Sequence, residues 1–289
     1  MNQFQKVIKY AAMAFAVFLT VFILGSIVSG LGLVFRVFNI GDNFISIRNN
    51  NGGVVMDDQS ITKSFNDVDR IYIKHGAGSL VVRSSDVDMV SVSVSGDDRN
   101  DYKVRTSGRT LNIEQKGQVF NLFNWNKDWR SKVVVTLPKG LILEDLDIDA
   151  GAGELTIEDF AVKDFNLDAG AGSVRINRVE AYKPDINGGA GEVVFSDVIF
   201  SDSDINCGVG RLDFDGKLLN KNDISAGVGE VSLKIQGKRD DYDIKIEKGL
   251  GEIRIDGQKF KEVNIRQSGS RHSLDIEGGV GSINVNFVD

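Results

Sequence analysis

The chain has few of the residues from which catalytic and metal centres are built. Its 289 residues include one cysteine, two histidines and two prolines. A single cysteine, Cys207, excludes an internal disulfide. The histidines, His75 and His272, lie about two hundred residues apart without clustered cysteines, so they make a poor zinc site. The sequence therefore predicts no catalytic residue, no cofactor and no enzyme activity.

The chain also lacks an excess of basic residues and, after residue 40, the periodicity of amphipathic helices. All 41 acidic residues follow residue 40, whereas three of the 34 basic residues, Lys6, Lys9 and Arg36, precede it. Taking 34 less three against 41 leaves the later part with a formal charge of −10, so no nucleic-acid partner is expected. No amphipathic helix pattern appears there, and neither Pro138 nor Pro184 interrupts a strong strand pattern.

Glycine, by contrast, is plentiful and regularly placed. The chain holds 32 glycines, and a Gly-x-Gly unit occurs seven times after residue 140, five of them at a spacing of 19 residues. Such a period is typical of stacked repeats, because one unit is too small to bury its own apolar face. The glycines are predicted to be structural corners: Gly151, Gly153, Gly170, Gly172, Gly189, Gly191, Gly208, Gly210, Gly227, Gly229, Gly249, Gly251, Gly279 and Gly281.

On both sides of each Gly-x-Gly unit, apolar and polar residues alternate as they do in strands with one buried face. Apolar residues stand three before the first glycine and four and six after it, as in Ile148, Leu155 and Ile157. We expect an all-β fold, a β-solenoid or β-helix of stacked repeats of about 19 residues, with two strands and two bends per coil. The middle residue of each unit is expected to point inward. Residues 65–289 form this β-strand-repeat domain, with regular repeats from about 141, and a long antiparallel meander stays an alternative.

The N-terminus carries the one long apolar run. The 26 uncharged residues from Tyr10 to Phe35 would form a helix about 39 Å long, against about 30 Å for the hydrocarbon core of a bilayer. Residues 1–40 are thus predicted to hold a short tail and one transmembrane helix, and residues 41–64 a polar linker. A cleaved signal peptide is the alternative, because lysines precede the run. The positive-inside rule favours a single-pass anchor in the cell membrane with the β domain on the extracytoplasmic side.

Several segments resemble a known family. They are residues 65–78, FNDVDRIYIKHGAG, residues 84–92, SSDVDMVSV, residues 133–140, VVVTLPKG, and the run of Asp-Ala-Gly-Ala-Gly units. In order and spacing they are similar to the bacterial DUF4097 proteins, also described as candidate adhesins, over nearly everything from residue 65 onward. The resemblance implies a β-strand-repeat domain, often on a membrane anchor and in a cell-envelope or envelope-stress context. It supplies no catalytic residues.

Acidic side chains recur at fixed positions before the glycines. Four or two residues ahead of the first glycine stand Asp147, Asp149, Asp168, Asp185, Asp204 and Asp223. Stacked coils about 4.8 Å apart would align these carboxylates in columns, and calcium takes oxygen ligands of this kind. The order and period of calcium-binding repeats are absent, however. The aspartates are therefore weak calcium candidates beside the interpretation as a solvated face interleaved with asparagine.

One segment concentrates aromatic side chains. Both tryptophans of the chain fall within residues 119–129, together with two phenylalanines; the four are Phe120, Phe123, Trp125 and Trp129. The segment is interpreted either as a cap over an open end of the solenoid or as an exposed patch that meets a glycan or the membrane interface.

These features together predict a membrane-anchored, extracytoplasmic β-repeat scaffold that binds cell-envelope polymers or surface proteins. An envelope-stress sensor is the alternative. It would act through a membrane partner, because the N-terminal tail is too short for a cytoplasmic signalling domain. A polysaccharide-active enzyme on a β-helix is a weaker alternative, because no carboxylate pair stands out among the abundant surface acids.

Overall fold

The protein is built from β-strands. The computed structural model describes residues 54–57, 60–96, 101–116 and 131–288, which contain no α-helix; the 3₁₀ turn η2 spans Arg239–Asp241. The strands are β1 (Val54–Asp57), β2 (Ser60–Phe65), β3 (Arg70–Ser85), β4 (Val90–Ser95), β5 (Tyr102–Ser107), β6 (Thr110–Gln115), β7 (Lys132–Pro138), β8 (Ile142–Gln236), β9 (Tyr242–Ile255), β10 (Gln258–Phe260), β11 (Val263–Ile265) and β12 (His272–Val288). The all-β prediction is confirmed.

Two predicted features lie outside the described residues. They are the predicted tail and transmembrane helix of residues 1–40 and the aromatic segment that holds Phe120, Phe123, Trp125 and Trp129. In the ranges that are described, we find no helix of the length and apolar character needed to cross a membrane.

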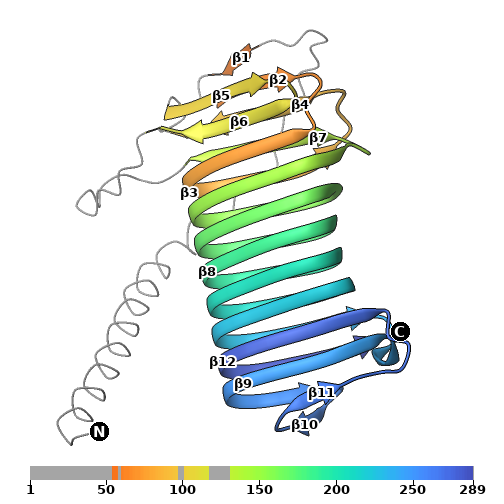
Figure 1. Ribbon diagram of the computed structural model, residues 1–289. Helices are drawn as coiled ribbons and strands as arrows, with labels where there is room; N and C mark the ends of the chain where they lie inside the picture. The colour runs from red at the N-terminus through yellow and green to blue at the C-terminus, as the bar shows by residue number, and fades with distance from the viewer. Residues whose placement is uncertain (1–53, 58–59, 97–100, 117–130, 289) are drawn as a thin grey trace, which may run out of the picture. The chain divides into compact units, whose positions relative to one another are not determined.

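A parallel solenoid forms the centre of the domain. β8 winds continuously through five Gly-x-Gly units, so its successive coils lie side by side (Figure 1). Side-chain hydrogen bonds join residues 19 positions apart, as between Ser203 and Asn222, and they fix the register at one repeat per coil. β3 pairs in parallel with the first coil of β8, and β12 with the last. The antiparallel alternative therefore does not apply to this part.

Each coil bends three times rather than twice. In a straight strand, buried residues alternate, so a change of phase marks a bend. The buried pairs of the first coil are Leu155 with Ile157, Phe160 with Val162, and Phe165 with Leu167, and the phase changes between each pair and the next. One bend places Asp159, Arg178 and Asp197, at equivalent positions of successive coils, at φ of 70°, 51° and 54°. The prediction of two strands and two bends was wrong, because short apolar sides cannot be separated by alternation alone.

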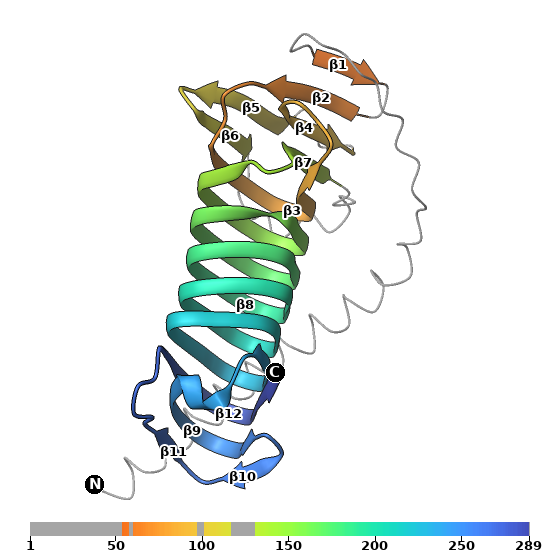
Figure 2. The same cartoon turned by 90° about the vertical axis from the view of Figure 1, so that its right-hand side faces the viewer.

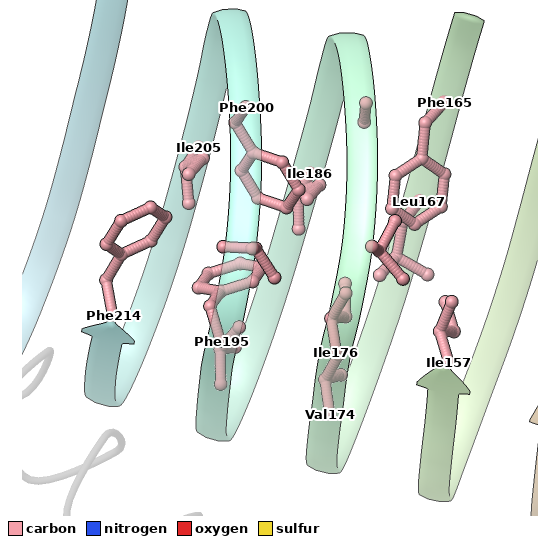
Figure 3. Packing of buried hydrophobic residues seen from close by; sticks show 14 of the residues in the cluster. Ile157, Phe165, Leu167, Val174, Ile176, Ile186, Phe195, Phe200, Ile205 and Phe214 are labelled. Carbon is pink, nitrogen blue, oxygen red and sulfur yellow. The ribbon is translucent and has the colours of Figure 1, made fainter. Parts of the chain in front are cut away.

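The core runs along the inside of the coils. Buried aliphatic and phenylalanine side chains of successive coils stack on one another (Figure 3). In the middle of the column, Phe195 meets Phe200 edge to face at a centroid distance of 5.3 Å, and Phe214 of the next coil lies 5.7 Å from Phe195. Each coil therefore shares its apolar contacts with both neighbours, as repeat architectures require.

Antiparallel strands close the end of the solenoid at β3. The first half of β3 pairs in parallel with β6 and the second half with β7. β5 then pairs antiparallel with β6, while β4, β2 and β1 continue antiparallel from β7. Because β1 and β2 belong to this sheet, it begins before the predicted boundary at residue 65 and takes in the end of the predicted linker, residues 41–64.

The last two coils are stacked in the reverse of their chain order. β12 pairs in parallel with residues 221–236 of β8 on one side and with β9 on the other. The chain therefore skips one position after β8, forms β9, and returns to fill the gap (Figures 1 and 2). β10 and β11 pair antiparallel with β9. This detour explains the longer spacings before Gly249 and Gly279 in the sequence.

The Gly-x-Gly bends stack so closely that no side chain fits between them. A Cβ atom placed on Gly189 would overlap the carbonyl oxygen of Gly170 in the coil before, and would lie 3.1 Å from its carbonyl carbon. The second glycines also have φ between 127° and 149°, from Gly78 to Gly281, a range that side chains disfavour. The glycines therefore serve the close approach of one backbone to the next.

We predict that Gly189→Ala destabilises the domain by more than about 2 kcal/mol, because the new methyl group meets main-chain atoms that cannot move aside. Gly188→Ala is the matched control. Its Cβ would meet the side-chain atom Cγ2 of Val193 at 2.9 Å, and alanine occupies the same position at Ala169 and Ala226. We expect this control to cost less than about 1 kcal/mol. Urea unfolding of both variants measures the difference, and equal midpoints would contradict the stacking argument.

Candidate functional site

The middle residues of the Gly-x-Gly units form an outward ridge. In the order in which the coils stack, this Gly-x-Gly ridge consists of Ala77, Ala152, Ala171, Ala190, Val209, Val228, Val280 and Leu250. The largest members are exposed, with Val228 at 46%, Val280 at 49% and Leu250 at 72%. The prediction that these residues point inward was wrong, because the chain turns its glycines, not the residue between them, toward the neighbouring coil.

The size of the ridge residues rises steadily along the solenoid. Along the chain Leu250 precedes Val280, but in space Val280 lies between Val228 and Leu250. Alanine therefore gives way to valine and then to leucine toward the end that β9 forms. Three of the six large exposed apolar residues among the described ones are consecutive members of this ridge. The end of the ridge at β9 therefore carries large exposed apolar side chains, whereas the end at β3 carries only the methyl groups of alanine.

A shallow hollow lies beside the ridge. It has a volume of about 570 Å³ and runs across five coils. It is lined by the first glycines of the units, among them Gly151, Gly170 and Gly189, which we call its floor. The polar residues that line it, Asp149, Asp168, Asn187, Asn206 and Ser225, we call its edge. Because glycine has no side chain, the main chain itself is accessible on the floor. We call this feature the glycine hollow.

A ladder of carboxylates and amides edges the glycine hollow. The side-chain amide of Asn187 donates to Asp168 in the coil before at 3.0 Å and to Asp185 of its own coil at 3.1 Å. In the next coil, Asn206 donates to Asn187 at 3.2 Å and to Asp204 at 2.9 Å. In these two coils, amides thus bridge carboxylates at a position where aspartate would add to the acidic column.

The six calcium candidates are spread along this face. Asp185 and Asp204 accept hydrogen bonds from asparagine amides. Asp149 forms an ion pair with Lys74, with 3.5 Å between Oδ2 and Nζ, and Asp223 forms one with Lys221. Burial and the nearby carboxylates of Asp145, Asp168 and Asp149 raise the pKa of Asp147. Within the described ranges, no three histidine, cysteine, aspartate or glutamate side chains are grouped closely enough to hold a metal ion.

Cys207 occupies a small slot under the ridge. It packs against the core at the position that Ala150, Ala169 and Ala226 fill in other coils. Burial raises the pKa of its thiol to about 11, so the reactive thiolate is scarce at neutral pH. The structure places this residue as the repeat pattern suggests, as a small packing group.

A buried polar cluster closes the first Gly-x-Gly unit, Gly76-Ala77-Gly78. His75 is 3% exposed, and its Nδ1 lies 2.6 Å from the hydroxyl of Tyr102 on β5. The Tyr102 hydroxyl donates to Ser131 Oγ at 3.2 Å, and Ser131 Oγ donates to the carbonyl of Ala77 at 2.8 Å. The Ser131 carbonyl accepts from the amide of Ser79 at 2.9 Å, as a further coil would. This cluster ties the antiparallel end of the sheet to the solenoid.

Sequence reasoning missed this cluster. His75 stands where other coils have alanine, glycine, cysteine or, before Gly249, lysine, and this departure from the small residues of the regular repeats was the only signal for the cluster. Its partners Tyr102 and Ser131 are remote in sequence and outside the regular repeats. Burial lowers the pKa of His75 to about 4, so the imidazole is neutral at pH 7.

The family model of Toastrack DUF4097 matches residues 68–275, well over half of the chain. The chain belongs to the Toastrack DUF4097 family. The resemblance read from the sequence is thereby confirmed. No curated protein matches the chain.

Solved structures similar to this Toastrack chain come from several bacteria. A candidate cell adhesion protein from Clostridium sporogenes is 18% identical, with a TM-score of 0.33 over 80% of this chain and 99% of that one. A candidate adhesin from Bacteroides fragilis is 13% identical, with a TM-score of 0.40 over 80% and 98%. A candidate lipid-binding protein from Parabacteroides distasonis is 16% identical, with a TM-score of 0.36 over 80% and 97%. With scores this low, the family assignment of the Toastrack chain rests on the family model alone.

The amide ladder generates a prediction about Asn187. We expect Asn187→Asp to lower the free energy of unfolding by about 0.5–1 kcal/mol at low ionic strength, because a third carboxylate then faces Asp168 and Asp185. High salt should restore most of the loss by screening. Asn264→Asp, exposed on β11, makes the same charge change and serves as the control. Thermal unfolding at low and high salt checks this, and equal losses for the two variants would refute the ladder's role.

The buried imidazole generates a prediction about pH. His75 binds a proton near pH 4 when folded but near 6.5 when unfolded, so lowering the pH through this window favours the unfolded chain. Stability that is present above about pH 6.5 should fall by up to about 3 kcal/mol on reaching about pH 4. His75→Asn keeps a polar side chain beside the Tyr102 hydroxyl without the titration. Urea midpoints near pH 7 and near pH 4.5 should differ less in the variant, and an unchanged difference would rule out His75 as the cause.

Proposed function

We propose that this protein is a membrane-anchored, extracytoplasmic scaffold whose Gly-x-Gly face binds an extended cell-envelope polymer or a segment of a surface protein. The apolar run of residues 10–35 supports the anchor, and the charge of the two termini of that run supports the outward orientation of the β domain. The proposal assigns the chain no catalytic step.

The observation that carries the proposal is the continuity of one face. The glycine hollow crosses five coils without interruption, and the Gly-x-Gly ridge runs beside it over the whole solenoid. A compact small molecule would need a closed pocket, whereas an open, repetitive strip suits an extended chain that lies along the solenoid axis.

The side chains and main-chain groups of the Gly-x-Gly ridge and the glycine hollow suit such a ligand. Main-chain groups over the glycine floor and the polar edge of Asp168, Asn187 and Asn206 can exchange hydrogen bonds with hydroxyl or amide groups of a polymer. Val228, Val280 and Leu250 add exposed apolar surface at one end, which binding would remove from water. The cross-coil ion pairs of Arg178 with Asp159 and of Lys163 with Glu144 lie at other positions of the repeat.

A ridge variant of the full chain tests the proposal. We expect the triple substitution Val228→Ser, Val280→Ser and Leu250→Ser to weaken co-sedimentation with purified cell-wall sacculi, or capture of solubilised surface proteins, by about tenfold, about 1.4 kcal/mol. The control is the pair Ile142→Ser and Tyr182→Ser, each 53% exposed and off the ridge. The unfolding midpoints of the variants should match that of the wild type. Equal binding by the ridge variant and the wild type would overturn the proposal.

A further inference from the structure

The coil that β9 forms has an open stretch of sheet edge. On the side of β9 that faces away from β12, β11 pairs with Ile244–Ile246 and β10 pairs with Ile253–Ile255. Among the described residues, no strand pairs with residues 247–252 on that side. The corresponding bend at the β3 end is closed by hydrogen bonds to Ser131 and Gln115. Because an unpaired edge is a template for another strand, the Gly-x-Gly bend of β9 is a candidate interaction surface.

The open stretch presents main-chain carbonyl groups. In the other coils each glycine carbonyl faces the glycine of the next coil, as Gly279 does toward Gly249 and Gly281 toward Gly251. The carbonyls of Gly249 and Gly251 therefore face away from β12. Lys248 Nζ donates to the carbonyl of Gly251 at 2.6 Å, from a position where the regular repeats have only small residues. This lysine thus occupies an acceptor that an added strand would use.

The open stretch is complementary to a second copy of itself. Its sequence is Lys248-Gly249-Leu250-Gly251-Glu252. In an antiparallel pair centred on Leu250, Gly249 lies opposite Gly251 of the second copy, and Lys248 lies opposite Glu252 of the second copy. Glycine then faces glycine, so no Cβ atom meets the main chain of the other strand. Opposite charges directly across two antiparallel strands attract each other, and a two-fold axis makes each of these contacts twice.

Leu250 supplies an apolar contact at the centre of this pair. Its side chain is 72% exposed, the highest value among the large apolar residues that the structure describes. Because the carbonyls of the flanking glycines point to the second copy, the two leucines form a non-hydrogen-bonded pair with about 4.5 Å between their Cα atoms. They shield each other from water. The two Gly-x-Gly ridges then meet at their largest residues, which gives the increase from alanine to leucine toward this end a physical role.

We propose that two copies of this chain form a two-fold dimer by antiparallel pairing of residues 248–252 of β9. The closed bend at β3 disfavours a head-to-tail stack, whereas the bend of β9 is open in both copies. β10 and β11 restrict the pairing to this bend, so the interface is short and the dimer forms at high protein concentration. On pairing, the Gly251 carbonyl exchanges the Lys248 ammonium for a main-chain amide, and the ammonium turns to Glu252 of the second copy. This inference does not depend on the proposed binding function.

Disulfide trapping of full-length chains in detergent tests the pairing. Leu250→Cys is combined with Cys207→Ala, so that the new thiol is the only one, and is oxidised with oxidised glutathione at high protein concentration. We expect a covalent dimer joined at position 250, because the Cα atoms of this pair lie within the range of a disulfide. Val280→Cys with Cys207→Ala is the matched control. Val280 is 49% exposed on the same ridge, but it would lie three strand spacings, about 14 Å, from its counterpart. Equal cross-linking of both variants, or none at position 250, would refute the pairing.

A charge exchange tests the register of the two strands. Lys248→Glu places two acidic side chains opposite each other, and Glu252→Lys places two basic ones. We therefore expect each variant alone to dimerise about tenfold more weakly than the wild type. In a mixture of the two variants both cross-strand pairs are attractive again, so sedimentation velocity should show a heterodimer of about wild-type affinity. Glu252 also pairs with Arg254 and Lys259 of its own copy, so unfolding midpoints are compared as well. If either variant alone dimerises as tightly as the mixture, the proposed register is wrong.

Discussion

The contact on which this structure depends is the one between glycine backbones of successive coils. At every Gly-x-Gly bend the carbonyl oxygen of one coil occupies the space that a side chain of the next would need, as Gly170 does for Gly189. This approach holds the coils in a register of one repeat each. The register in turn places Ser203 opposite Asn222 and Phe195 beside Phe214, so that polar and apolar ladders both run the length of the column. The steric limit at this bend therefore explains why glycine recurs there in each coil.

The same limit creates the candidate binding face. Because both glycines are turned toward neighbouring coils, the residue between them points to the outside, and a column of such residues becomes the Gly-x-Gly ridge. The floor of the glycine hollow is bare main chain for the same reason. At its polar edge, Asn187 and Asn206 follow Asp149 and Asp168 and donate their amides to nearby carboxylates, where two further aspartates would extend the acidic column. The close approach of glycine backbones thus underlies both the stacking of the coils and the proposed binding surface.

The two ends of the solenoid are closed in different ways. At β3 the Ser131 carbonyl takes the place of a neighbouring coil, and His75 and Tyr102 fill the slot that small residues occupy elsewhere. At the other end β10 and β11 pair antiparallel with β9, and the terminal strand is placed inside rather than outside it. The repeat pattern predicts neither closure. The pattern stops at the ends of the solenoid, where contacts between residues remote in sequence determine the structure. The sequence around His75 departs from the repeat but does not identify Tyr102 or Ser131 as partners.

By itself the sequence determined the all-β class, the stacking of units of about 19 residues, the glycine positions and the small slot of Cys207, because a local period and a missing side chain are properties of the chain. It also carried the family resemblance. Only the tertiary structure decided that each coil has three bends, that Val228, Val280 and Leu250 point outward, and that β12 lies between β8 and β9. Alternation records which residues share a face but not which way a bend turns. The order of two similar coils depends on a long connection, residues 256–271, whose path no local pattern specifies.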